Sequence, residues 1–440
     1  MKVALALAII AGLAAPASAN PADAFGFGSR AAAMAGAHTA ATDDTSANYY
    51  NPAALARFDL IRFDLGYQAA IPNLRINGQD LRVDSSRGFT IGTALPGRVG
   101  PLKVAIGGGV FIPDQHVVRL RSITAEQPRF ALYDNRPQRM FLGANVAVEI
   151  GERLWLGGGI GYMSSTAGSA MLAGRLGFPL AEDSDLQIAI DTDLLTIRYA
   201  QLGALVAVND WLNVGVSFRE QFNLDVVQLV IVEGDIGAEG MPIVEDAFLN
   251  ISSISQDLFQ PAQLTVGLSA QLTDRLALAF DLSYQRWSGF ENPTAIIDLE
   301  LDAGMFNDLI DLPENPPGFP DPRFSDIAVP RIGFEWLVTH DERRTVHLRG
   351  GYSYERSPAP EQVGENNFVD NDKHTVTVGM GYMLRGFSSI LPHPLSIDAY
   401  AGFTYLPERD HQKLSPVDPV GDYRSDGAIP QLGVQTRWKF

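Results

Sequence analysis

Apolar and polar residues alternate with a period of two along much of this chain. In 275–284, leucine, phenylalanine and tyrosine take the even-numbered positions, and polar or small residues take the odd ones. Residues 60–69 and 344–355 repeat the pattern. Because successive side chains of a strand point to opposite faces, each segment predicts a strand with one apolar face. The segments run for about 10–15 residues, which fits a tilted membrane strand better than the shorter strands of a soluble sandwich.

About fourteen such segments follow one another, an even number of the kind that bacterial outer-membrane barrels use. They are expected at 57–70, 87–97, 101–112, 138–150, 153–165, 196–208, 211–228, 262–272, 275–289, 327–338, 344–357, 373–385, 394–406 and 428–440. Short turns such as 151–152 and 273–274 alternate with long polar connections such as 229–261 and 291–326. Short turns inside the cell envelope and long loops outside are typical of these barrels. The pattern therefore predicts an all-β transmembrane antiparallel β-barrel of about 14 strands.

Both ends of the chain fit export to the bacterial outer membrane. After Lys2, an apolar run ends in the sequence ASA, which predicts a secretory signal over residues 1–19. No later stretch has the roughly 20 continuous apolar residues of a transmembrane helix. At the other end, Phe440 closes an alternating strand and resembles the signal by which barrel-insertion machinery recognises outer-membrane proteins.

The composition argues against several classes of function. The chain has 51 acidic and 33 basic residues, a net charge of −18, so nucleic acid is a poor partner. It has no cysteine, which excludes disulfides, thiol catalysis and thiolate metal sites. The histidines lack metal-ligand spacing, and "GFGSRA" at 26–31 mimics a dinucleotide fingerprint without a preceding strand. We expect no enzyme activity, cofactor or metal, although a lipid hydrolase with its serine and histidine on separate strands stays open.

Residues 20–55 lie ahead of the first predicted strand and do not alternate. They are rich in alanine and glycine, with a helix-prone run at 30–41 and a break at Asn51-Pro52. A barrel of this size has a lumen that such a segment can enter, and the small side chains at 31–37 permit close packing there. The alternative is a loose leader on the periplasmic side.

This segment resembles the N-terminal region of the FadL/TodX family of outer-membrane channels for long-chain fatty acids and other hydrophobic compounds. The matching features are a Phe-Gly pair, the stretch GSRAAAMAGA, Asp43-Asp44, the stretch YYNPA at 49–53, and Leu55. Residues 276–290, 348–360 and 374–384 look like strands of the same family. The resemblance implies a fourteen-stranded barrel over 56–440 and a lumenal hatch, or plug, over 20–55.

Seven residues of the segment are candidates for contact with an acyl chain, for sealing the hatch, or for turning the chain into the wall. They are Phe25, Phe27, Met34, Tyr49, Tyr50, Asn51 and Pro52. In the third predicted strand, Gly107, Gly108 and Gly109 mark a bend or bulge. The resemblance implies that this strand is kinked and leaves an opening for sideways exit into the membrane. The alternative is that these glycines only make room for the hatch.

Four basic residues of the predicted wall are candidates for contact with a fatty-acid carboxylate: Arg62, Lys103, Arg331 and Arg349. A buried anion is stabilised by a charge-assisted hydrogen bond. The alternatives are pairing with hatch acids such as Asp43 or Asp44, or exposure to water.

The chain is thus expected to be a passive, gated channel for hydrophobic molecules, with long-chain fatty acids as the first substrate class. An aromatic-hydrocarbon channel of the same family and a structural or adhesive barrel are the alternatives. We expect a monomer surrounded by membrane lipid and lipopolysaccharide.

Overall fold

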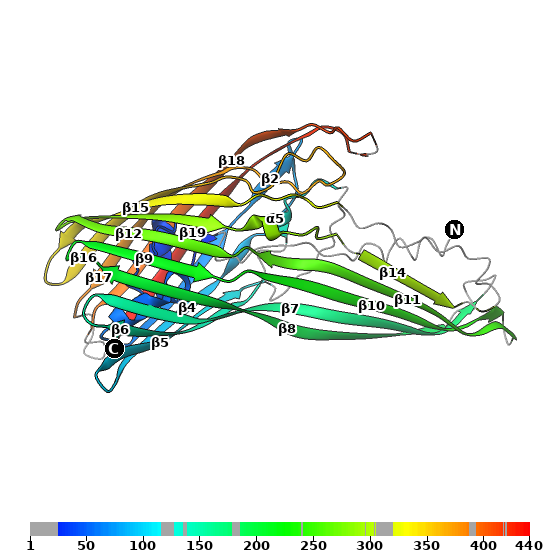
Figure 1. Ribbon diagram of the computed structural model, residues 1–440, viewed down its shortest axis with the longest axis horizontal. Helices are drawn as coiled ribbons and strands as arrows, with labels where there is room; N and C mark the ends of the chain where they lie inside the picture. Colours follow the sequence, from blue (N-terminus) through cyan, green and yellow to red (C-terminus); the bar gives the residue numbers. More distant parts are fainter. Residues whose placement is uncertain are drawn as a thin grey trace.

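The computed structural model describes residues 25–115, 127–134, 139–177, 185–238, 241–294, 296–302, 304, 320–386, 393–416, 418 and 420–440. The predicted secretory signal at 1–19 lies outside these residues. A barrel forms one part of the molecule, and a sheet of long strands projects from one of its ends (Figure 1).

Fourteen of the described strands close into an antiparallel barrel. They are β1 (Arg62–Ala70), β4 (Ser86–Val99), β5 (Leu102–Pro113), β6 (Phe141–Ile150), β7 (Leu154–Gly177), β8 (Asp185–Ala207), β9 (Leu212–Arg219), β12 (Gln263–Thr273), β13 (Leu276–Gln285), β15 (Ile327–His340), β16 (Arg344–Glu355), β17 (Lys373–Leu384), β18 (Leu395–His411) and β19 (Tyr423–Lys439). The last strand pairs with the first, from Arg62↔Lys439 to Ala70↔Gln431. This pairing closes the ring, so the wall presents no free strand edge. The predicted all-β barrel of 14 strands is confirmed.

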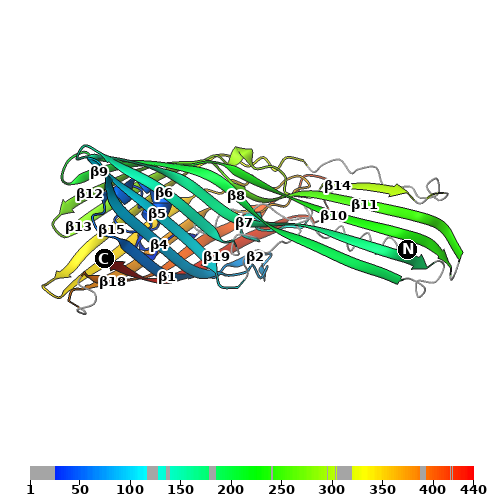
Figure 2. The same ribbon diagram turned by 90° about the horizontal axis from the view of Figure 1, so that it is seen from below.

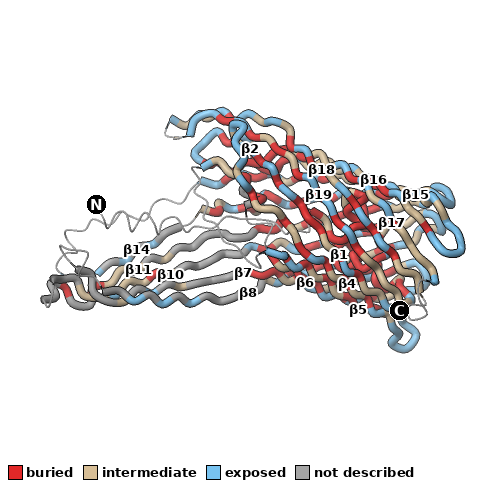
Figure 3. The backbone as a smooth tube through the Cα atoms, turned by 180° about the vertical axis from the view of Figure 1, so that it is seen from behind, coloured by how far each residue is buried: buried red, intermediate tan, exposed pale blue. Residues whose placement is uncertain are grey.

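The alternation of the sequence becomes an inside and an outside of the wall. In β12, Leu264, Val266 and Leu268 are exposed, whereas Gln263, Thr265 and Gly267, which alternate with them, are buried. Buried and exposed positions alternate in this way along the barrel strands (Figure 3). The outward apolar face suits contact with lipid, and the inward polar face lines the lumen. No helix among the described residues is long and apolar enough to cross a membrane.

The strands that project from the barrel were expected to be shorter, with loops between them. The predicted strands 153–165 and 196–208 are parts of β7 and β8, which are 24 and 23 residues long. The predicted loop 229–261 is largely a hairpin of β10 (Phe222–Ala238) and β11 (Met241–Gln260). With β14 (Ile296–Asp302), these strands form the projecting sheet (Figure 2). A strand exposed to water on one face has the same period of two as a strand in lipid, so the sequence pattern does not mark where a strand leaves the membrane.

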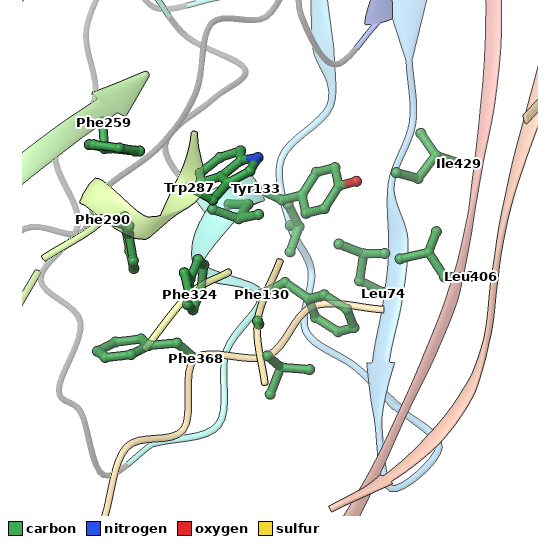
Figure 4. Packing of buried hydrophobic residues seen from close by; sticks show 14 of the residues in the cluster. Leu74, Phe130, Tyr133, Phe259, Trp287, Phe290, Phe324, Phe368, Leu406 and Ile429 are labelled. Carbon is green, nitrogen blue, oxygen red and sulfur yellow. The ribbon is translucent and has the colours of Figure 1, made fainter. Parts of the chain in front are cut away.

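Short elements complete the fold. They are β2 (Asn73–Ile76), β3 (Gln79–Asp80), α3 (Ser29–Ala33), α4 (Ala47–Tyr50), α5 (Ala131–Asp134), and the 3-10 helices η2 (Pro52–Arg57) and η5 (Trp287–Gly289). At the barrel end from which the sheet projects, aromatic residues pack together, including Phe130, Phe259, Trp287, Phe290 and Phe324 (Figure 4). Phe290 and Phe324 stack with their ring centroids 4.3 Å apart. This cluster covers part of the lumen at that end.

Candidate functional site

Residues 25–58, called the inner segment from this point, lie inside the ring of strands. Ala31, Ala33, Ala53 and Leu55 have no measurable exposure. The inner segment contacts inward-facing glycines of wall strands on several sides of the ring: Gly92 of β4, Gly107 of β5, Gly157 of β7, Gly203 of β8, Gly215 of β9, Gly333 of β15 and Gly379 of β17. Because glycine has no side chain, the segment approaches the wall at backbone distance. Its small residues and these glycines are complementary features of the two surfaces.

Asn51 and Pro52 turn the chain from the inner segment toward the wall. The Asn51 side chain donates from Nδ2 to the carbonyls of Thr39 and Ala204, at 2.9 and 3.0 Å. Its Oδ1 accepts from the Ala53 amide at 3.2 Å, so it caps the 3-10 helix that Pro52 begins. Asn51 therefore links two parts of the inner segment to strand β8.

Asn48 is a second anchoring residue that nothing in the sequence pattern marks. Its Nδ2 donates to the carbonyls of Thr93 and Gly108, at 2.9 and 3.0 Å. Its own carbonyl accepts from the side chains of Asn145 and Gln201, at 3.1 and 2.8 Å. An unsatisfied buried amide is costly, so these partners hold the segment against β4, β5, β6 and β8.

The strand ladder is continuous at the glycine triplet, where the resemblance implies an opening. Strand β5 pairs with β4 from Gly88↔Pro113 to Val99↔Leu102 and with β6 from Val104↔Val148 to Phe111↔Phe141, without a register shift. A Cβ on Gly107 would meet Asn48 and lie 2.8 Å from a methyl carbon of Leu55. The described wall is closed at this point. The alternative interpretation, in which the glycines make room for the inner segment, accounts for Gly107 and Gly109.

Gly107→Val is expected to displace the inner segment, whereas Gly108→Val is not. A side chain at 107 points inward onto Asn48 and Leu55, and overpacking of this kind costs about 1–3 kcal/mol. At 108 the nearest atoms are 3.3 and 3.6 Å away, on the outer side of the strand. Single-channel conductance should rise only for Gly107→Val, with heat-modifiable gel mobility confirming that both barrels are folded. If both variants keep the conductance of the parent chain, this packing of the inner segment against β5 is contradicted.

Charged residues join the other side of the inner segment to strands β15, β16, β18 and β19. This ionic cluster consists of Arg30, Asp43, Asp44, Glu335, Arg349, Asp398 and Arg437. Arg30 Nε lies 3.0 Å from Glu335, and Arg349 Nη1 lies 2.6 Å from the fully buried Asp398. Although burial raises the pKa of the Asp44 carboxyl, His38 and the nearby arginines lower it well below its usual range. The cluster is therefore held together by ionised groups.

The four candidate carboxylate contacts fall into different places. Arg349 is engaged in the ionic cluster. Lys103 pairs with Asp59 at 2.6 Å, and Arg62 donates to the Asp43 carbonyl and lies over the Phe58 ring. These three are engaged with protein groups, and the bond from Arg62 goes to the main chain of Asp43 rather than to its carboxylate. Arg331 instead lines a cavity in the lumen.

The lumen cavity has a volume of about 90 Å³ and is partly open to solvent. On one side it is lined by the aromatic residues Phe25, Tyr49, Tyr50 and Tyr133. On the other side, inward positions of adjacent strands supply Arg331, Ser353, Thr375 and Thr404, which follow one another in register from β15 to β18. The cavity thus has an aromatic face and a hydroxyl-rich polar face that carries two cations, Arg331 and Lys373, and two acids, Asp281 and Glu355.

Of the predicted hatch contacts, Phe25, Tyr49 and Tyr50 therefore reach the cavity. Phe27 stacks on Tyr49 with centroids 5.7 Å apart and packs against Phe141 instead. Met34 lies against Gly333 and Gly351 of the wall. The hydroxyl face was not predicted, since serines and threonines at inward strand positions look like ordinary lumen residues in the sequence.

The comparisons with known proteins agree with this architecture. Residues 133–426 match the family model described as outer membrane protein transport protein (OMPP1/FadL/TodX). A Pseudomonas aeruginosa FadL homologue has a similar crystal structure, with a TM-score of 0.57, 15% identity, and coverage of 98% of this chain and 100% of that one. The P. putida toluene transporter TodX has a TM-score of 0.53 and 14% identity, and the match covers 94% of this chain and 99% of that one. The CymD monoaromatic hydrocarbon channel has a TM-score of 0.54 and 15% identity, with coverage of 94% of this chain and 97% of that one. A search by sequence against curated proteins found no match. At these identities the solved structures show a shared fold.

Proposed function

Because this chain belongs to the FadL/TodX family of outer-membrane proteins that transport hydrophobic compounds, we propose that its substrates are amphipathic, with long-chain fatty acids as the first class. The barrel lies in the bacterial outer membrane, and its family is one of transport channels rather than enzymes. The residues 20–55 act as a hatch that closes the lumen until substrate binds. Passage is passive and needs no energy source.

The two-faced cavity is the observation that supports an amphipathic substrate. An acyl chain against Tyr49 and Tyr50 is stabilised by about 0.8 kcal/mol for each CH₂ removed from water. On the polar face, which also carries Asp281 and Glu355, Arg331 and the neighbouring hydroxyls are the groups that can donate charge-assisted hydrogen bonds to a carboxylate. A neutral hydrocarbon would use only the aromatic face and leave the polar face unpaired.

An aromatic hydrocarbon is the second candidate, since the aromatic face by itself suits a ring. The names of two similar structures, a toluene transporter and a monoaromatic hydrocarbon channel, also favour it. Contacts with lipopolysaccharide, a monomeric state, and recognition of the exposed Phe440 by insertion machinery stay predictions.

Arg331→Gln is expected to lower the affinity for a long-chain fatty acid about tenfold and to leave toluene uptake unchanged. Loss of one charged hydrogen bond costs about 1.5–3 kcal/mol, and the hydrocarbon does not make that bond. Uptake of both labelled compounds should be measured in cells that display equal amounts of barrel. Arg153→Gln, an exposed arginine near Asp210 at the short-turn end, is the matched control.

The two candidates predict different results in this experiment. Toluene uptake by the parent chain without any fatty-acid uptake would favour the hydrocarbon channel. Equal losses of both compounds in Arg331→Gln would show that this arginine supports the fold of the lumen and does not select a carboxylate.

A further inference from the structure

Two cavities border the same three wall strands, at two different levels of the lumen. The lumen cavity with the aromatic face is lined there by Arg331 of β15, Ser353 of β16 and Thr377 of β17. A second cavity of about 80 Å³ is lined by Glu335, Arg349 and Gly381 of the same strands. It is also lined by Arg437 and Lys439, near the C-terminal end of the wall. The two cavities therefore lie one after the other along β15, β16 and β17.

A single turn of the inner segment, residues 33–36, separates the two cavities. It packs against three inward glycines, Gly333, Gly351 and Gly379, which together form the glycine row. A Cβ on Gly333 would lie 2.7 Å from Met34 Cβ, and one on Gly379 would lie 2.5 Å from Ala33 Cβ. Along each strand, the glycine lies two to four residues from the lining residues of both cavities. Residues 33–36 therefore block the passage between the two cavities at the glycine row.

The backbone of this turn is strained. Ala35 has a φ of 52° and Gly36 a φ of 77°, in the left-handed region that alanine rarely adopts. The Thr377 hydroxyl holds the turn on both sides, since it donates to the Ala33 carbonyl at 2.8 Å and accepts from the Ala35 amide at 3.1 Å. Strained backbone that surrounding contacts hold in place is found at elements that move.

The opposite side of the inner segment is held differently. There Asn48 and Asn51 bond to wall carbonyls, and Leu55 packs in a buried apolar cluster with Trp155 and Leu205. The β5 ladder on that side runs through Gly107 to Gly109 without a register shift.

From these observations we propose that solutes pass the inner segment along β15, β16 and β17, and that residues 33–36 are the gate. The gate opens when Met34 leaves the glycine row, while the Asn48 and Leu55 side stays in place. Both cavities are polar or charged on this line, so the passage admits a polar or ionised headgroup. It leads toward the end of the barrel that holds the short turns and the C-terminus. This inference rests on the proposed function and specifies the route for its substrate.

The chain has no cysteine, so two engineered disulfides can test the route. Met34→Cys with Gly333→Cys ties the gate to the wall. Asn48→Cys with Gly109→Cys ties the opposite side, where the two Cβ positions would be 3.1 Å apart. Both pairs lie within about 1 Å of disulfide geometry, so small shifts suffice. Each variant is compared with itself in oxidised and reduced form.

Oxidation of the 34–333 pair is expected to lower labelled fatty-acid uptake at least about tenfold, because a locked closed state cannot shift to the open one. Oxidation of the 48–109 pair should change uptake less than about twofold under the same population argument. Undiminished uptake in the oxidised 34–333 variant would overturn the proposal. Equal loss in both variants would also overturn it, because it would mean that the whole segment must move.

Ion conductance in planar bilayers, without any lipid substrate, separates this proposal from the proposed function. If the parent chain takes up no fatty acid but oxidation of the 34–333 pair alone closes an ion pathway, the substrate is wrong and the route stands. Met34→Gly serves where a disulfide does not form. Met34→Gly should raise the ion conductance, and Leu55→Gly, on the opposite side of the inner segment, should not. If the conductance rises only in Leu55→Gly, the proposed route is wrong.

Discussion

Deletion of residues 20–50, with the export signal kept, is expected to turn a closed barrel into an open pore. The described part of this stretch fills the lumen and is buried almost throughout. Barrels between the eight-stranded and the porin class have an interior wide enough for water once their contents are removed. The expected result is a large rise in single-channel conductance and entry of solutes that the intact chain excludes.

The barrel should survive this deletion because the wall charges of the ionic cluster also pair with one another. Arg349 contacts both Glu335 and Asp398, and Arg437 Nε lies 2.8 Å from Asp398. Heat-modifiable gel mobility measures whether the truncated barrel is folded. A folded barrel with the conductance of the parent chain would show that the inner segment does not close the lumen.

Asp398→Asn is expected to destabilise the barrel far more than the loss of an exposed ion pair. Asp398 is fully buried and lies between Arg349, at 2.6 Å, and Arg437, at 2.8 Å. Removing one partner from a buried charged group leaves the other charges uncompensated, which costs about 3–5 kcal/mol. The barrel should therefore unfold at a lower temperature in detergent, as followed by its gel mobility.

Asp410→Asn is the matched control for this substitution. Asp410 pairs with Arg424 at 2.7 Å, but the two side chains are 63% and 60% exposed, so water already solvates them. Its unfolding temperature should stay at that of the parent chain. A loss in Asp398→Asn no greater than in this control would mean that the ionic cluster does not stabilise the barrel.

Much of the wall could be predicted because the period of a strand is local. One apolar face and one polar face repeat every two residues, and short turns interrupt the pattern where the chain reverses. The break at Asn51-Pro52 is also local, since proline fixes its own backbone and asparagine caps the next turn. The number of barrel strands and the two faces of each strand followed from such signals.

The lengths of the projecting strands could not be predicted in the same way. Strands β7, β8, β10 and β11 continue beyond the roughly 9–11 residues that a membrane requires. A period of two indicates a strand but does not say whether lipid, water or another strand covers its faces. Pairings such as the parallel one between β10 and β7 depend on the whole sheet.

What the sequence by itself determined is a barrel wall, its alternating faces and a small-residue segment ahead of it. Only the tertiary structure decided which candidate residues are free to meet a ligand. Arg30 and Glu335 are 305 positions apart in the chain, and their contact depends on where the inner segment lies in the lumen. The same placement occupies Arg349, leaves Arg331 at the cavity, and fills the space beside Gly107 with Asn48 and Leu55. Ion pairs and close packing act between neighbours in space, and closing the barrel makes those neighbours.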